Sequence, residues 1–209
     1  MENSIFSQVA ILFSVLFAIT VHEYTHAKLA DAAGDPTPRI YGRVTLNPVA
    51  HFDPIGFIFI VMVTLTGFGL GWGKPVPMDP RKMKNPRWDH FWAVFGAPLS
   101  NLGLAILATI LLRVLMIAGI PLPLEVNLVL FYFIMVNIGL FLFNMLPVGP
   151  LDGMWVVSTF LPERLRYEWI RFNQTIGGFL LLGLIFFGGG ILSTVLKPMY
   201  LFIFRLLGL

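Results

Sequence analysis

The chain has 209 residues, of which 57% are hydrophobic and 12% are charged. Ordinary soluble domains carry about 25% charged residues, so this composition excludes a soluble globule and indicates a polytopic membrane protein. With four histidines and no cysteine, any bound metal must be held by His, Asp or Glu, and disulfides and a cysteine nucleophile are excluded. The formal net charge of +3 is modest and favours basic cytoplasmic loops over nucleic-acid binding.

The first apolar segment, roughly residues 4–32, is predicted to be a retained membrane helix. Residues 5–21 are interrupted only by Ser, Thr and Gln. No small-residue cleavage site follows them, which argues against a signal peptide. Gly34 followed by Pro36 is a stop signal for this helix.

The last third of this segment contains His22-Glu23-Tyr24-Thr25-His26, the H-E-x-x-H pattern of zinc metalloproteases. Two histidines four residues apart lie on one helix face, about 40° from each other, so both imidazoles can reach one metal ion. Glu23 projects beside that face and can accept a proton from a water that the metal activates. The alternative is a pair of core histidines with a chance glutamate. Three ionisable groups in a membrane helix, at about 2.5–3.5 kcal/mol each, argue against that alternative.

A catalytic zinc ion usually has three protein ligands, so the third must be His51, His90 or a carboxylate. Asp152 is the favoured candidate, because it is an acid in a deeply apolar neighbourhood behind a segment broken by Pro147 and Pro150. Irregular backbone at membrane depth is tolerated where it lines a cavity. Asp152 could instead cap the helix that follows it. His51 is interpreted as a turn residue and His90 as an interfacial one.

Two amides, Asn101 and Asn144, lie within apolar helices. Either they bond to neighbouring helices, or they line a cavity and bind a substrate backbone. The glycine-rich stretch 67–73 is too apolar for a phosphate loop, so it does not indicate a nucleotide site.

The segments after the first helix differ in the spacing of their apolar residues and in length, and different structures are predicted for them. Residues 36–54 alternate polar and apolar side chains between prolines, which predicts short strands or a hairpin at the membrane surface. The apolar run 55–70 is short for a span and is predicted to be re-entrant. Long helices are predicted over 90–118, 126–146 and 172–195, with an amphipathic segment over 154–171 and a short apolar end over 197–209.

The basic residues divide the loops between the two sides of the membrane. Loops 33–53, 71–88 and 154–171 carry them, whereas the loop 119–125 has none. A complete crossing by 55–70 would export the most basic loop, so the positive-inside rule favours a dip that returns to the same side. The five tryptophans also flank the basic side, at positions 72, 88, 92, 155 and 169. The site is therefore expected to face the cytoplasm.

The chain resembles the site-2 protease family of intramembrane zinc metalloproteases. The likeness is carried by residues 22–26, 47–56 with 71–76, 97–101 and 144–153, the last with a Leu-Asp-Gly signature. It implies that His22, His26 and Asp152 bind one zinc ion, that Glu23 activates the water, and that Asn101 and Asn144 help to hold an extended substrate. The chain departs from the family in Ala97, where Gly is common, and in showing no PDZ or CBS domain.

We therefore expect an all-α polytopic membrane protein of about 4–6 transmembrane helices, with a small membrane-associated β element after the first helix. Residues 1–209 are expected to form a single membrane-embedded metalloprotease domain, with a catalytic core over about 4–160 and C-terminal helices over 161–209. It is expected in the plasma membrane of a prokaryote, where it would cleave peptide bonds in or near transmembrane segments of other proteins. Its partners would be the lipid bilayer and a transmembrane protein substrate, with no nucleic acid. The alternatives are a membrane zinc-binding protein or transporter without protease activity, and a proteolytically silent scaffold.

Overall fold

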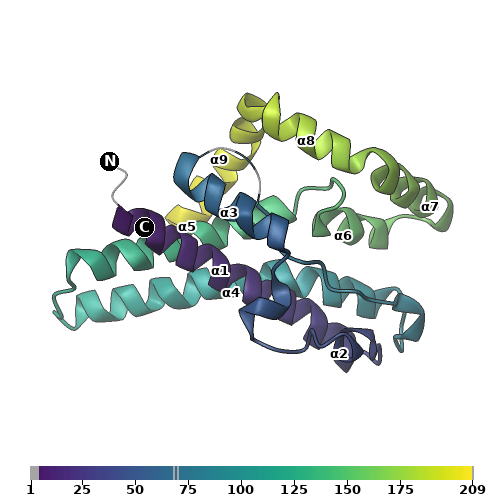
Figure 1. The fold of residues 1–209 in the computed structure, drawn as a ribbon, viewed down its shortest axis with the longest axis horizontal. Coiled ribbons are helices and arrows are strands. Elements are labelled where there is room, and N and C mark those ends of the chain that lie inside the picture. Colours follow the sequence, from purple (N-terminus) through teal and green to yellow (C-terminus); the bar gives the residue numbers. More distant parts are fainter. Residues whose placement is uncertain (1–4, 68, 70, 209) are drawn as a thin grey trace.

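The computed structural model describes residues 5–67, 69 and 71–208, and its regular structure is helical (Figure 1). Four segments are long and apolar enough to cross a membrane: α1 (Ile5–Ala32), α4 (Trp88–Ile117), α5 (Leu124–Asn144) and the segment Glu163–Phe186. The predicted multi-pass helical architecture is therefore confirmed at this level. The helices expected over 4–32, 90–118 and 126–146 begin and end within about two residues of their predicted limits. Residue 4 lies outside the described residues.

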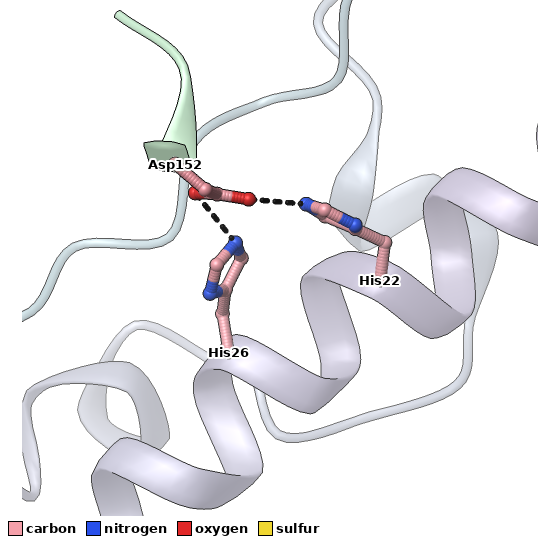
Figure 2. Close-up of side chains that lie close together, drawn as sticks. All are labelled: His22, His26 and Asp152. Carbon is pink, nitrogen blue, oxygen red and sulfur yellow. Dashed lines mark ion pairs between the residues drawn. The ribbon is translucent and has the colours of Figure 1, made fainter. Parts of the chain in front are cut away.

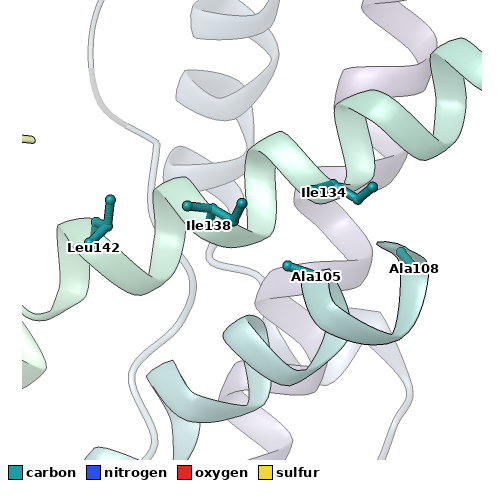
Figure 3. Packing of buried hydrophobic residues seen from close by; sticks show 5 residues of the cluster. All are labelled: Ala105, Ala108, Ile134, Ile138 and Leu142. Carbon is teal, nitrogen blue, oxygen red and sulfur yellow. The ribbon is translucent and has the colours of Figure 1, made fainter. Parts of the chain in front are cut away.

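The core lies where α1, α4 and α5 pack against one another. Alanines of α4 face larger aliphatic residues of α5 (Figure 3), in a cluster formed by Ala105, Ala108, Ile134, Ile138 and Leu142. Small residues let two helix backbones approach closely, which is the packing typical of membrane helices. The C-terminal helix α9 (Gly189–Leu206) covers this cluster with Tyr200 and Phe204.

The segment after α1 does not form the predicted strands. It contains the short helix α2 (Thr37–Ile40) and a 3-10 helix at Pro48–His51. Pairing of the β type in the described residues is limited to one antiparallel bridge between Phe52 and Gly73. Proline lacks the N–H that a ladder requires and fixes φ near −65°, so the prolines of this segment favour helical turns. The predicted β element is thus reduced to a single bridge.

The apolar run 55–70, of which residues 68 and 70 lie outside the described part of the chain, belongs to a hairpin whose two ends meet. Asp53 caps the helix α3 (Pro54–Thr66) by accepting hydrogen bonds from the backbone N–H groups of Ile55 and Gly56. The helix ends at Gly67, where φ of 72° requires a residue without a side chain. The chain then returns to pair Gly73 with Phe52. At 1.5 Å per residue α3 is about 20 Å long, shorter than the hydrocarbon core of a bilayer.

The C-terminal part differs from its prediction in where the helix breaks. The amphipathic segment 154–171 is divided between α6 (Asp152–Phe160) and α7 (Glu163–Phe172). A π-helical turn at Asn173–Gly177 joins α7 to α8 (Gly178–Phe186), and the helix expected over 172–195 is interrupted between α8 and α9. The interruption coincides with three successive glycines at 188–190, which are weak helix formers.

Candidate active site

Three side chains from distant parts of the chain meet beside the last third of α1 (Figure 2). His22 and His26 project from one face of α1, and Asp152 is the first residue of α6. His22 Nε2 lies 3.1 Å from Asp152 Oδ2, and His26 Nε2 lies 3.3 Å from Asp152 Oδ1. Within the described ranges this is the one group of three His, Asp or Glu residues that could hold a metal ion, with ligand atoms within 4.8 Å of one another.

The hydrogen bonds of His22 and His26 use the Nδ1 atoms and leave the two Nε2 atoms, which face Asp152, free to bind a metal ion. His26 Nδ1 lies 2.8 Å from the carbonyl oxygen of Ala93, which can only accept, so Nδ1 carries a proton. His22 Nδ1 lies 2.8 Å from Asn101 Oδ1. When both imidazoles are neutral, their Nε2 lone pairs face the carboxylate of Asp152, an arrangement that a metal ion between them would stabilise. Ligand bonds of about 2.0–2.1 Å in a tetrahedral zinc site place neighbouring ligand atoms about 3.3 Å apart. The two imidazole–carboxylate separations match this value, and the whole set of ligand atoms lies within 4.8 Å.

Asp152 reaches the histidines because of the glycine that follows it. A Cβ atom on Gly153 would lie 2.4 Å from the carbonyl oxygens of Met145 and Leu146, so only glycine lets α6 start this close to the end of α5. The side chain of Asp152 does not cap α6; it points to the imidazoles (Figure 2). Burial raises the pKa of the Asp152 carboxyl, but the two imidazoles lower that pKa further, so the group remains a carboxylate.

The position of α6 is set by hydrogen bonds from three other elements. Arg87, just before α4, donates to the carbonyl oxygens at the end of α6, with Nε 2.8 Å from Thr159 O. Trp169 Nε1 of α7 donates to Met154 O at 2.9 Å. Asn173 Oδ1 accepts from Gly149 N at 2.8 Å and so holds the loop that precedes α6. The third ligand is therefore supported by contacts remote from the metal site.

Glu23 lies at the wall of a cavity that also contains the three candidate ligands. The cavity has a volume of about 330 Å³. Its other walls come from the return segment 71–76, from α5 with Asn144, and from Trp155 and Leu181. Glu23 Oε2 is buried and has no hydrogen-bond partner among the described residues. This oxygen is thus available to a water molecule or to a substrate in the cavity.

The two amides predicted to bind substrate lie in different environments. Asn101 is fully buried in α4 and contacts His22, Ala18 and Asn137. Asn144 is half-buried at the end of α5, lines the cavity and donates to Leu140 O. Asn144 is therefore the one of the two whose side chain borders the space that a substrate would enter.

The remaining two histidines lie outside the group of three ligands. His51 is fully buried at the end of its 3-10 helix, where Nε2 lies 2.7 Å from Thr45 O. Burial, followed by the charge of Arg43, lowers the pKa of His51, so its ring is neutral and donates to Thr45. His90 is buried in α4 with its ring edge-on to Trp155, at a centroid distance of 5.2 Å. Both rings are surrounded by protein rather than exposed at a surface.

One polar residue near the site, Arg43, is not indicated by any sequence signal. Its side chain is 3% exposed and donates through Nη2 to the carbonyl oxygen of Lys74, while Nε is buried without a partner in the described structure. Burial lowers the pKa of the guanidinium, and the negative charge of Glu23 opposes that shift. In the sequence Arg43 is one basic residue of a basic loop, which is indistinguishable from a charge that only orients the membrane protein.

The fold and this site define a class: multi-pass helical membrane proteins with a candidate centre of two histidines and one aspartate beside a buried glutamate. No protein-family model matches the chain, and no solved structure gives a significant match. The chain is similar to a protein of Bacillus subtilis (strain 168) named "Putative zinc metalloprotease YwhC", with 34% identity over 193 residues that cover 90% of this chain and 84% of the relative. The chain belongs to the zinc metalloprotease family of that relative.

Proposed function

We propose that this protein is an intramembrane zinc metallopeptidase of the site-2 protease type, which hydrolyses peptide bonds in or near transmembrane segments of other proteins. The observation that carries the proposal is the meeting of His22, His26 and Asp152 at a cavity whose wall also holds the unpartnered carboxylate oxygen of Glu23. Membership of a zinc metalloprotease family supports the choice of zinc and of peptide hydrolysis.

Each residue of the site has a part in this reaction. His22, His26 and Asp152 would hold one zinc ion, which supplies Lewis-acid activation of water and of the scissile carbonyl. Glu23 accepts a proton from the attacking water and donates it to the leaving amine. Asn144, which borders the cavity, is proposed to bind the backbone of an extended substrate. A helical substrate must unwind before it enters, because its carbonyl groups are otherwise hydrogen-bonded within the helix.

The test of this function separates metal binding from chemistry. Glu23→Gln keeps the size of the side chain but removes the base, so we expect zinc content to stay near one ion per chain. Cleavage of a membrane-protein substrate should fall by at least about 100-fold, the contribution typical of a general base. Substrates can be found as membrane proteins that accumulate in cells carrying the variant. If the Glu23→Gln variant cleaved the substrate at the wild-type rate, the mechanism would be refuted. If the wild-type protein bound zinc but cleaved nothing, a zinc-binding protein or transporter would be favoured.

The proposed orientation places the cavity toward the cytoplasm. It rests on the basic loops 33–53, 71–88 and 154–171, which the predicted topology assigns to the side of Asp152, and on the meeting of the two ends of the α3 hairpin. The chain has no cysteine, so single cysteines can be introduced at the exposed positions Tyr41, Arg81 and Ile120. A membrane-impermeant thiol reagent added to intact cells should label only Ile120→Cys, and all three should react after permeabilisation. Labelling of Arg81→Cys from outside would show that residues 55–70 cross the membrane.

A further inference from the structure

We propose that Asn137 of α5 is a positioning residue for the metal ligand His22, and that it acts through the side chain of Asn101. Asn137 is fully buried and does not border the cavity. The inference rests on the metal site of the proposed function, but it does not require that the protein be a peptidase. It concerns which nitrogen of His22 carries the proton.

The two amides and His22 form one continuous chain of hydrogen bonds across three helices. Asn101 Oδ1 lies 2.8 Å from His22 Nδ1 of α1. Asn101 Nδ2 donates to Ala18 O of α1 and to Asn137 Oδ1 of α5, each at 3.1 Å. Asn137 Nδ2 donates to Phe133 O, one turn earlier in α5, at 2.8 Å. Asn101 and Asn137 are both 0% exposed, so the chain is closed to solvent.

The direction of this chain is set by the backbone carbonyl groups at its ends. The oxygens of Phe133 and Ala18 can only accept hydrogen bonds. The NH2 group of Asn137 must therefore face Phe133, which turns its Oδ1 toward Asn101. Both N–H donors of Asn101 are then used, by Ala18 and by Asn137, so its Oδ1 faces His22. His22 must donate from Nδ1.

The direction of these hydrogen bonds determines which nitrogen of His22 is free to bind a metal ion. With its proton on Nδ1, a neutral His22 presents the lone pair of Nε2 to Asp152, as a metal ligand must. His26 obtains the same tautomer directly from Ala93 O. His22 obtains it from the side chain of Asn101, whose orientation is held jointly by Ala18 O and by Asn137 Oδ1. Asn137 supplies the second of these two bonds, so its loss lowers the cost of the reversed orientation of Asn101, in which an N–H would face His22 Nδ1 and favour the wrong tautomer.

The variant Asn137→Ser isolates this role. A serine in a helix donates to the carbonyl group four residues earlier, as Ser14 does to Ala10 O. The bond to Phe133 O is thus retained, but the shorter side chain cannot reach Asn101. Loss of a residue that hydrogen-bonds to a metal ligand, without itself binding the metal, lowers metal affinity by about 10–100-fold. Because Asn137 acts one bond further away, we expect about a 10-fold weaker affinity for Zn²⁺, measured on the full chain in detergent by competition with a chromophoric chelator.

Two comparisons distinguish positioning from a general loss of stability. In an Asn101→Ala background, Asn137→Ser should cause no further loss of zinc affinity, since its only route to His22 has been removed. Ile134→Ala, a buried apolar substitution one turn earlier in α5, should lower the unfolding temperature and leave zinc affinity unchanged. The absorption spectrum of bound Co²⁺ should change in Asn137→Ser and not in Ile134→Ala. Asn137→Leu, which fills a similar volume without polar atoms, should show the same loss of affinity as Asn137→Ser.

Several outcomes would overturn the inference. Zinc affinity equal to wild type in both Asn137→Ser and Asn137→Leu would refute it while leaving the proposed metal site intact. An equal loss from Asn137→Ser in the wild-type and Asn101→Ala backgrounds would also refute it, because Asn137 would then act by another route. A wild-type chain that binds no zinc would refute the metal site and this inference together.

Discussion

The two sides of the candidate site differ in how completely their buried polar atoms are paired. On the side of the helix bundle, His22 and His26 bond to α4, and Asn101 bonds to α1 and α5. In the described structure, buried side-chain atoms without a hydrogen-bond partner lie in Glu23, Arg43 and His51 on the side of the α3 hairpin, and in Asp152 between the two sides. Buried polar groups are normally satisfied, so unpaired ones mark places where water or a ligand binds. We infer that the bundle side holds the candidate metal ligands in place and that the hairpin side receives water or substrate.

Charge on the two sides shows the same difference. The bundle side contributes neutral amides and carbonyl groups, which orient the imidazoles without adding charge. The hairpin side places the cation Arg43 near the carboxylate of Glu23, and each is buried with an unpartnered atom. A buried charge is costly unless another charge compensates it, so we infer that Arg43 and Glu23 stabilise each other.

The largest effect is expected from removing the candidate metal ligand Asp152, which lies between the two sides. Asp152→Ala should lower zinc affinity by more than about 100-fold, since loss of a direct ligand exceeds the effect of losing an outer partner. Zinc content of the purified chain, measured by atomic emission, checks this. His51→Ala and His90→Ala are the matched controls and should retain zinc. An empty site in His51→Ala with a full site in Asp152→Ala would mean that the third ligand is His51.

A smaller effect is expected from removing Arg43, the cation on the side of the α3 hairpin. Arg43→Met should destabilise the protein by about 2 kcal/mol, because Glu23 loses the compensating charge of Arg43. In a Glu23→Gln background the same substitution should cost less, which a double-mutant cycle of thermal unfolding measures. Arg81→Met, at an exposed position, should change stability by less than about 0.5 kcal/mol. An equal cost of Arg43→Met in both backgrounds would show that Arg43 acts only through Lys74.

The smallest effect is expected from substituting Gly73, where the return segment of the α3 hairpin approaches Glu23, the proposed general base. A Cβ atom on Gly73 would lie 2.9 Å from the side chain of Ile19 and 3.3 Å from Glu23 Oε1. Gly73→Ala should therefore displace the return segment and cost about 1–2 kcal/mol. It should also reduce cleavage several-fold while zinc content stays unchanged. Gly103→Ala, where nothing lies within 4 Å of the added atom, is the control and should not reduce either. A loss of zinc in Gly73→Ala would mean that the hairpin also supports the ligands.

Sequence patterns predicted the helices α1, α4 and α5 and the His22–His26 pair because these depend on local spacing. Apolar runs of sufficient length form membrane helices wherever they occur, and a separation of four residues places two histidines on one face in any helix. The β element was predicted from alternation alone, and the prolines of the segment prevented it. Arg43 and Asn137 were not predicted. A single arginine in a basic loop and a single amide in an apolar helix have no distinctive spacing, and their roles depend on neighbours from other elements.

The sequence by itself thus determined a helical membrane protein with two histidines and a glutamate on one helix, because helix period and hydropathy are local properties. Only the tertiary structure decided that Asp152 meets these histidines, since their approach depends on the contact of Gly153 with the end of α5. It also decided that Asn101 bonds to His22 at 2.8 Å. Residues 79 positions apart in the chain come into contact only when α1, α4 and α5 pack. In a buried environment each amide then adopts the single orientation that pairs all of its donors and acceptors.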